Sequence, residues 1–236
     1  MIKAVFFDFY GTLAGWEPAA GEIQRQAAEA EGLTVAPDAI ERAYAAANAL
    51  LDRENAVRRV ASRMPRERDA FFAEYERTLL ATAGYEASLE LSAAIWARVR
   101  SAPKELALYP DALPALAALN EAGLTLGVIS NMGTDLPDQL ARLGLSRFAV
   151  LSVSSGEVGV AKPHPEVFRT ALRKAGVDAG EAFHVGDGYE SDVLGASRAG
   201  LNTLFLLRDL RVAPPEGCVT VRALTDVAGA IRDGTW

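Results

Sequence analysis

The fold is decided by the stretch Val5-Phe6-Phe7-Asp8-Phe9-Tyr10-Gly11-Thr12-Leu13. Four of its first five side chains are apolar, which predicts a buried strand of a parallel sheet. Gly11 and Thr12 predict a turn directly after that strand, where open α/β sheets bind their ligands. Asp8 is therefore expected at the mouth of a crevice, where it would act as a nucleophile or a metal ligand. On this stretch alone, an aspartate that caps a turn or helix is an equally good interpretation.

Three later segments favour chemistry at Asp8 over capping. A second apolar segment ends at Ser130 and Asn131. Lys162 lies in a loop that the neighbouring prolines stiffen, so its amine is expected to have limited freedom. A third apolar segment ends at Asp187, and Asp192 follows shortly after it.

These four motifs, in this order, resemble the haloacid dehalogenase-like hydrolase superfamily, in the type that carries a helical cap (C1, subfamily I). The resemblance covers residues 1–14 and 103–236, which are expected to form the catalytic core. It implies an α/β fold, with a Rossmann-like parallel sheet and helices on both faces. Residues 15–102 are expected to form an all-helical cap domain, inserted between the first and second motifs.

The resemblance also implies a phosphatase mechanism and a magnesium site. Asp8 would be the nucleophile, forming an aspartyl-phosphate that water then hydrolyses. Carboxylates at Asp8 and Asp187 would repel each other unless a cation lay between them, which is the physical case for Mg²⁺. The main-chain carbonyl of Tyr10 would be a further ligand. Asp192 belongs to the same site and is expected to orient a metal-bound water or Lys162.

The remaining residues of the motifs are expected to bind the phosphoryl group of a small anionic substrate. Lys162 would supply positive charge and Ser130 a hydroxyl donor. Asn131 would add a contact to the phosphoryl group or shape the loop. Thr12 is expected to brace the Asp8 carboxylate. The two histidines have simpler interpretations than a general base, with His184 in the core of a strand and His164 exposed.

Tyr10 departs from the phosphatase pattern, which has a second aspartate at this place. A phenol is a poor proton donor at neutral pH, because its ordinary pKa is near 10. A 2-haloacid dehalogenase, which has tyrosine here and needs no metal, is therefore the alternative. Against it stands Asp187, where those dehalogenases carry a neutral residue. A magnesium-dependent phosphatase that lacks the usual general acid is preferred, and a non-enzymatic module that binds a phosphorylated ligand is the third possibility.

Composition restricts the partners. The chain has 236 residues, a hydrophobic fraction of 50% and a net charge of −7. This charge argues against binding to nucleic acid or to an acidic membrane surface, which need clustered positive charge. Cys218 is the single cysteine and is interpreted as a small apolar filler, and a cytoplasmic location without a signal peptide is expected. The oligomeric state is not indicated.

The periodicity of apolar residues predicts the remaining elements. Residues 15–102 are expected to contain helices and no strand. Two groups of residues there have helical spacing and are expected to be core rather than a substrate-binding site. The first gathers on one helical face, and the second repeats the pattern: Phe71, Phe72, Tyr75 and Leu79, then Ile95 and Val99. A solvated helix face is expected for four arginines: Arg53, Arg58, Arg59 and Arg63. Further along, helices are predicted at 110–122, 136–143, 165–175, 191–199 and 224–231, and strands at 124–130, 148–153, 182–186 and 203–207.

Overall fold

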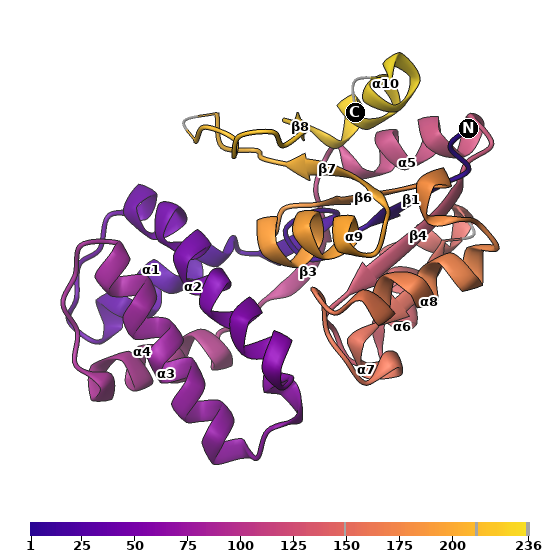
Figure 1. Ribbon diagram of the computed structural model, residues 1–236. Coiled ribbons are helices and arrows are strands. Elements are labelled where there is room, and N and C mark those ends of the chain that lie inside the picture. The colour runs from indigo at the N-terminus through magenta and orange to yellow at the C-terminus, as the bar shows by residue number, and fades with distance from the viewer. Residues whose placement is uncertain (149, 211, 235–236) are drawn as a thin grey trace. The chain divides into compact units, whose positions relative to one another are not determined.

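The computed structural model describes residues 1–148, 150–210 and 212–234 (Figure 1). The chain forms two compact units, one of Met1–Gly15 with Ala107–Trp236 and one of Trp16–Leu106. The first unit is an α/β core and the second is helical. In the described part of the chain, no helix is both long and apolar enough to cross a membrane.

The core unit is built on one six-stranded sheet of order β5-β4-β1-β6-β7-β8. Each strand runs parallel to its neighbours. Its strands are β1 (Ala4–Phe7), β4 (Thr125–Ser130), β5 (Leu151–Ser154), β6 (Ala182–Gly186), β7 (Asn202–Leu206) and β8 (Thr220–Val221). The chain leaves β1 for β4 on one side and later returns to β6 on the other, so the order of strands reverses beside β1. Ligands of open α/β sheets bind at such a point.

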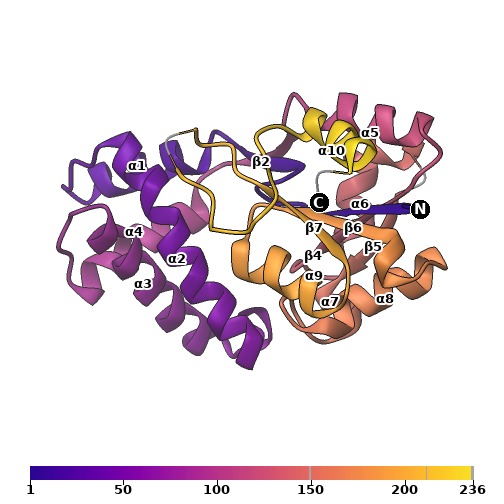
Figure 2. The same cartoon turned by 45° about the horizontal axis from the view of Figure 1, so that its top comes forward.

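Helices cover both faces of this sheet, which confirms the predicted Rossmann-like fold. The helices of the unit are α5 (Ala112–Glu121), α6 (Leu136–Arg142), α7 (Ser155–Val158), α8 (Pro165–Ala175), α9 (Gly195–Arg198) and α10 (Val227–Asp233). Figure 2 shows α5 and α10 on one face and α8 and α9 on the other. Phe6 and Ile129 of the sheet pack against Val167 and Phe168 of α8, and all four side chains are buried.

Three predicted elements differ from the structure. The strand predicted at 148–153 begins at Leu151, because Phe148 ends a 3₁₀ turn from Leu145; residue 149 lies outside the described residues. The helix predicted at 191–199 is a π-helical turn, Tyr189–Leu194, followed by the short α9. In this wide turn the amide of Val193 donates to the carbonyl of Gly188 at 3.2 Å, and the carboxylate of Asp192 accepts from the amide of Gly188. The helix predicted at 224–231 begins only after a 3₁₀ turn.

The second unit is helical. Its helices are α1 (Ala20–Ala30), α2 (Pro37–Val57), a 3₁₀ turn (Val60–Ser62), α3 (Pro65–Thr82) and α4 (Leu89–Ser101). Two short strands, β2 (Ala14–Glu17) and β3 (Glu105–Leu108), pair with each other where the chain passes between the units. The prediction that residues 15–102 contain no strand was wrong for β2, a strand too short to show a periodic pattern.

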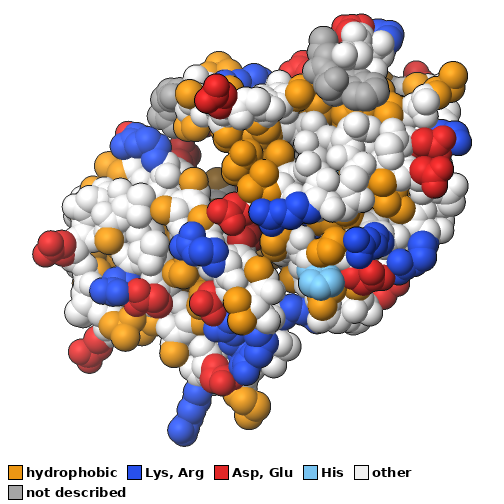
Figure 3. All heavy atoms as spheres, viewed as in Figure 1, with side chains coloured by type: hydrophobic (Ala, Val, Ile, Leu, Met, Phe, Trp, Pro, Cys, Tyr) orange, Lys and Arg blue, Asp and Glu red, His pale blue; other side chains and the backbone are white. Residues whose placement is uncertain are grey.

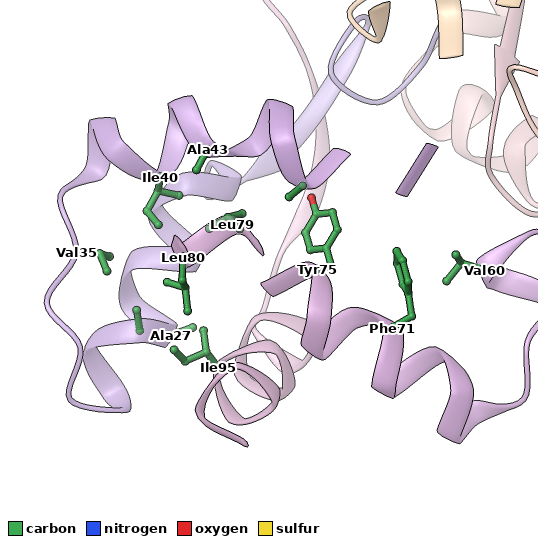
Figure 4. Close-up of a cluster of buried hydrophobic side chains, with 12 residues drawn as sticks. Ala27, Val35, Ile40, Ala43, Val60, Phe71, Tyr75, Leu79, Leu80 and Ile95 are labelled. Atoms are coloured by element: carbon green, nitrogen blue, oxygen red, sulfur yellow. The ribbon is translucent and has the colours of Figure 1, made fainter. Parts of the chain in front are cut away.

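A continuous apolar core holds the four helices together (Figure 4). Phe71, Tyr75 and Leu79 of α3 lie in this core, as the helical spacing predicted, with Ile95 of α4 beside them. Trp96 stacks on Phe72 with ring centroids 4.2 Å apart. Each buried aromatic or aliphatic side chain of this kind contributes about 1.5–3 kcal/mol when it leaves water. These aromatic side chains therefore account for the packing of α3 against α4.

On the face that Figure 3 shows, separate acidic and basic side chains are interspersed over the surface. In the helical unit Arg58 pairs with Glu67, and Arg63 pairs with Glu54 at 2.5 Å. The exposed Arg58 pair contributes at most about 1 kcal/mol. The prediction of a solvated face was wrong for Arg63, because its guanidinium is largely buried over the ring of Phe71. Arg58 and Arg63 thus have partners within their own unit.

One carboxyl group lies inside the helical core. Glu76 of α3 is fully buried, and one of its oxygens accepts a hydrogen bond from the side-chain amide of Gln24. Its second oxygen, Oε2, has no hydrogen-bond partner in the described part of the chain. Burial raises the pKa of Glu76 to about 8. The helical unit therefore folds with this group in its protonated form at neutral pH.

We expect Glu76→Gln to remove a pH dependence of stability. The pKa of Glu76 is about 8 in the folded chain against 4.5 as the ordinary value, so its contribution is complete below pH 4.5 and is lost as pH rises to about 8. Between pH 5 and pH 8 the melting temperature of the wild type should fall by roughly 5 °C relative to the variant. Circular dichroism melting curves measure this. Glu74→Gln, an exposed change on the same helix, is the control, and parallel curves for wild type and Glu76→Gln would contradict the assignment.

Candidate active site

Three predicted residues meet at the carboxyl edge of the sheet because the strands are in register. Phe7 of β1 pairs with Val128 of β4 and with Val185 of β6, so the three strands end within two residues of the same level. Asp8 directly follows β1, and its main-chain amide donates to the carbonyl of Val185 at 2.8 Å. Ser130 ends β4 and is buried. Asp187 directly follows β6 and remains exposed.

Lys162 lies between two of the carboxylates. Its Nζ donates to Oδ1 of Asp8 at 2.5 Å and to Oδ1 of Asp192 at 2.6 Å. Only 2% of the lysine is exposed. Burial alone would lower the pKa of Lys162, but the two carboxylates raise it above its ordinary value. The lysine is therefore a fixed positive charge beside Asp8.

Asn131 holds the lysine loop by its main chain. The side-chain carbonyl of Asn131 accepts from the amide of Lys162 at 2.7 Å, and the side-chain NH₂ donates to the carbonyl of Lys162 at 3.1 Å. The side-chain amide of Asn131 thus pairs with the main chain of Lys162 through both its oxygen and its nitrogen, as the main chain of a neighbouring strand would. Of the two roles predicted for Asn131, the structure shows the shaping of the loop; the predicted contact to a phosphoryl group competes with these bonds.

The carboxylate of Asp192 accepts several hydrogen bonds. Besides Lys162, its carboxylate accepts from Nε2 of His184 at 2.8 Å and from the amide of Gly188 at 3.0 Å. Burial lowers the pKa of His184, so the ring is neutral and donates through Nε2. Although burial opposes it, Lys162 and His184 together hold the pKa of Asp192 well below its usual range. The carboxylate of Asp192 thus contacts both Lys162 and His184. The sequence predicted His184 as a core residue and gave it no role in the site.

The turn after β1 is packed directly against Asp187. The hydroxyl of Thr12 donates to Oδ1 of Asp187 at 3.1 Å. The prediction that Thr12 braces Asp8 was therefore wrong, because the turn directs this hydroxyl at the end of β6. Gly11 has φ of +92°, and a Cβ there would lie 2.3 Å from Oδ2 of Asp187. Only glycine allows both the turn and this close approach.

Tyr10 lies on the open side of the same turn, with 40% of the residue exposed. Its main chain forms a bridge with Ala14, and the amide of Gly11 donates to the carbonyl of Ala14 at 2.8 Å. Desolvation, followed by the nearby Tyr109 and Asp187, raises the pKa of the Tyr10 phenol above its ordinary value. The phenol keeps its proton across the neutral range and is a weak acid there.

Asp8, Asp187 and Asp192 form a carboxylate cluster in which one oxygen from each lies within 4.8 Å of the others. Burial raises the pKa of Asp8 to about 8, with Asp192 and Asp187 adding to the effect, although Lys162 acts in the opposite direction. Desolvation by surrounding atoms and the charge of Asp192 raise the pKa of Asp187 to about 6, although the side chain still reaches solvent. Lys162 does not neutralise all the negative charge that three ionised carboxylates would carry. Their oxygen atoms suit a hard divalent cation such as Mg²⁺. Asp187 leaves it open to solvent.

A family model for haloacid dehalogenase-like hydrolases matches residues 2–200. The glyceraldehyde 3-phosphate phosphatase of Methanopyrus kandleri is 33% identical over 210 residues, which are 88% of this chain and 85% of that protein. This match spans both units of the chain.

Two solved structures have the same fold as this chain. A hydrolase of this family from Bacillus subtilis, bound to magnesium, has a TM-score of 0.65 at 20% identity, covering 98% of this chain and 99% of that one. The L-2-haloacid dehalogenase of Xanthobacter autotrophicus has a TM-score of 0.61 at 24% identity, covering 98% and 99%. At these identities the likeness concerns the fold, so the choice of reaction depends on the residues of the site.

Proposed function

The chain belongs to the haloacid dehalogenase-like hydrolase family, and we propose that it is a magnesium-dependent phosphatase that acts on a small phosphorylated metabolite through Asp8. The observation that carries the proposal is the carboxylate cluster of Asp8, Asp187 and Asp192, with Lys162 between two of its members. A second carboxylate beside the nucleophile requires a cation and would repel an anionic haloacid without one. The phosphatase from Methanopyrus kandleri, similar over most of both chains, supports the same choice.

The nucleophile in this mechanism is Asp8. Lys162 engages Oδ1, and we assign the attack on phosphorus to Oδ2. The new O–P bond forms as the ester P–O bond breaks, and the leaving oxygen departs as an anion that takes a proton from water afterwards. Water then hydrolyses the aspartyl-phosphate, which releases phosphate and restores Asp8. Lys162 and the hydroxyl of Ser130 would stabilise the phosphoryl oxygens in both steps.

Asp8, Asp187 and the main-chain carbonyl of Tyr10 would hold Mg²⁺. When bound, the ion supplies positive charge to the carboxylates and to the transferring phosphoryl group. Asp192 would act through Lys162 rather than as a direct ligand, because its oxygens already accept hydrogen bonds from Lys162, His184 and Gly188.

The helical unit, residues 16–106, is proposed to serve as the cap. Two chain crossings join it to the core, which is the arrangement that a hinged cap requires. In that role it would exclude bulk water from the aspartyl-phosphate and select the substrate. We also propose a cytoplasmic location, for which the single cysteine is suitable.

A 2-haloacid dehalogenase is the second candidate, because Tyr10 favours it. In that reaction the Asp8 carboxylate would attack carbon and expel halide, which needs neither a metal nor a proton donor. The phenol at position 10 is compatible with this chemistry, whereas Asp187 is not, unless a counter-charge neutralises it.

One assay distinguishes these candidates. An activated aryl phosphate and a 2-haloacid are tested side by side, each with Mg²⁺ and with a chelator. We expect turnover of the aryl phosphate with Mg²⁺, and its loss with chelator and in Asp187→Asn, since both treatments remove charge from the proposed metal site. Asp138→Asn, an exposed change of the same kind, is the control. Chelator-resistant halide release would establish the dehalogenase, and binding of phosphate without turnover of either substrate would indicate a binding module.

A further inference from the structure

Arg208 connects three segments of the core unit that are distant in sequence. It follows β7, and its guanidinium forms a bidentate pair with Asp111, at 2.8 Å from Nη1 and 3.1 Å from Nη2. The same Nη2 donates to the main-chain carbonyl of Thr12 at 3.0 Å. The guanidinium also lies over the ring of Tyr109, 4.4 Å from its centroid. These contacts fix the arginine in one position against the turn after β1.

Thr12 transmits this contact to the carboxylate cluster. While its carbonyl accepts from Arg208, its hydroxyl donates to Asp187. Gly11, the residue before it, approaches Asp187 so closely that a Cβ would not fit. The main chain of residues 10–12 therefore has little room to move on the side of β6, and Arg208 holds it from the side of β7.

We propose that Arg208 is a positioning residue for the metal site. It holds the carbonyl of Thr12 and thereby the whole turn after β1. That turn carries the Tyr10 carbonyl and faces Asp187. The inference rests on the proposed function for the identity of the metal. The role requires the planar guanidinium of arginine, because it contacts Asp111 and the Thr12 carbonyl at the same time. The single amine of a lysine cannot make the bidentate pair with Asp111. Groups that orient metal ligands in this way typically change affinity by about 10–100-fold when removed.

The chain offers a matched control in Arg222. Its guanidinium also donates to main-chain carbonyls in the core unit, those of Leu207 at 3.1 Å and Asp209 at 2.8 Å. Neither of these carbonyls belongs to the turn after β1. Leu207 and Asp209 flank Arg208, so Arg222→Gln removes contacts to the same segment but keeps the Arg208 guanidinium that donates to Thr12.

The test compares Arg208→Gln, Arg208→Lys and Arg222→Gln with the wild type in two measurements. Hydrogen exchange in the metal-free protein follows the amides of residues 9–14, several of which donate within the turn. Calorimetric titration with Mg²⁺ alone gives the metal affinity. We expect about 10-fold faster exchange confined to residues 9–14 and about 10-fold weaker Mg²⁺ binding in Arg208→Gln. Arg208→Lys should recover only part of both, and Arg222→Gln should match the wild type.

The outcomes separate this inference from the proposed function. If Arg208→Gln matches the wild type in both measurements, Arg208 does not position the site. If exchange speeds up across the whole core unit instead, the arginine has only a general structural role. If the wild type binds no Mg²⁺, the proposed function fails, and the exchange of residues 9–14 alone decides whether Arg208 holds the turn.

Discussion

Asp8→Asn should lower kcat by about 10⁴-fold or more, because an amide is too weak a nucleophile to attack phosphorus and the covalent intermediate cannot form. The substitution also removes the oxygen that accepts from Lys162 at 2.5 Å and one of the carboxylates proposed to hold the metal. Steady-state kinetics with an aryl phosphate at saturating Mg²⁺ would measure the loss. Mass spectrometry of the quenched wild-type reaction should show a phosphoryl group on residue 8.

The variant is nearly isosteric, so its fold can be checked separately. Its circular dichroism spectrum should match that of the wild type, and Asp138→Asn at the surface should keep full activity. Wild-type turnover in a purified Asp8→Asn protein, with the amide verified by mass, would show that another residue attacks the substrate.

Tyr10→Asp should raise the rate on alkyl phosphates by up to about 10²-fold, the usual size of general acid catalysis. In the wild type the phenol has its pKa raised above the ordinary value, so it gives little help to a departing alkoxide. The leaving group must then depart with its own negative charge. Wild-type rates should therefore increase steeply as the pKa of the leaving group falls, and aryl or acyl phosphates should be better substrates than sugar phosphates.

The comparison uses kcat/KM for one aryl and one alkyl phosphate, chosen to bind alike, in both forms of the enzyme. The aryl substrate should gain little, because its leaving group needs no proton. Tyr10→Phe is the matched control, since it keeps the ring and removes only the hydroxyl. Equal gains on both substrates, or a wild-type rate that ignores leaving-group pKa while chemistry limits the rate, would mean that another proton donor serves the site.

The sequence predicted which residues lie together at the strand ends better than it predicted the hydrogen-bond partners of the site residues. Asp8, Ser130 and Asp187 could be predicted together because parallel strands bring their carboxyl ends to one edge. The contacts of Thr12 and Asn131 could not be predicted in the same way, because they depend on the direction in which a turn points a short side chain. For Thr12 that direction led to Asp187, and for Asn131 it led to the backbone of Lys162.

Arg208 shows a second limit of sequence reasoning. It lies after the last motif, in a segment without a periodic pattern, and its partners are Thr12 and Asp111, far away along the chain. A single arginine in such a place is most often a solvated surface residue. Only the order of strands, which brings the end of β7 near the turn after β1, places it beside the site.

The place of β1 in the sheet has a consequence for how the protein is made. Both neighbours of β1, the strands β4 and β6, are encoded after the whole helical unit. At about 5–20 residues per second, a ribosome needs on the order of 6–24 s to proceed from β1 to the end of β4. During that time Val5, Phe6 and Phe7 have no native partner strand, and an unpaired apolar strand invites association with other chains. We therefore expect the nascent chain to depend on chaperones until residue 130 has left the exit tunnel.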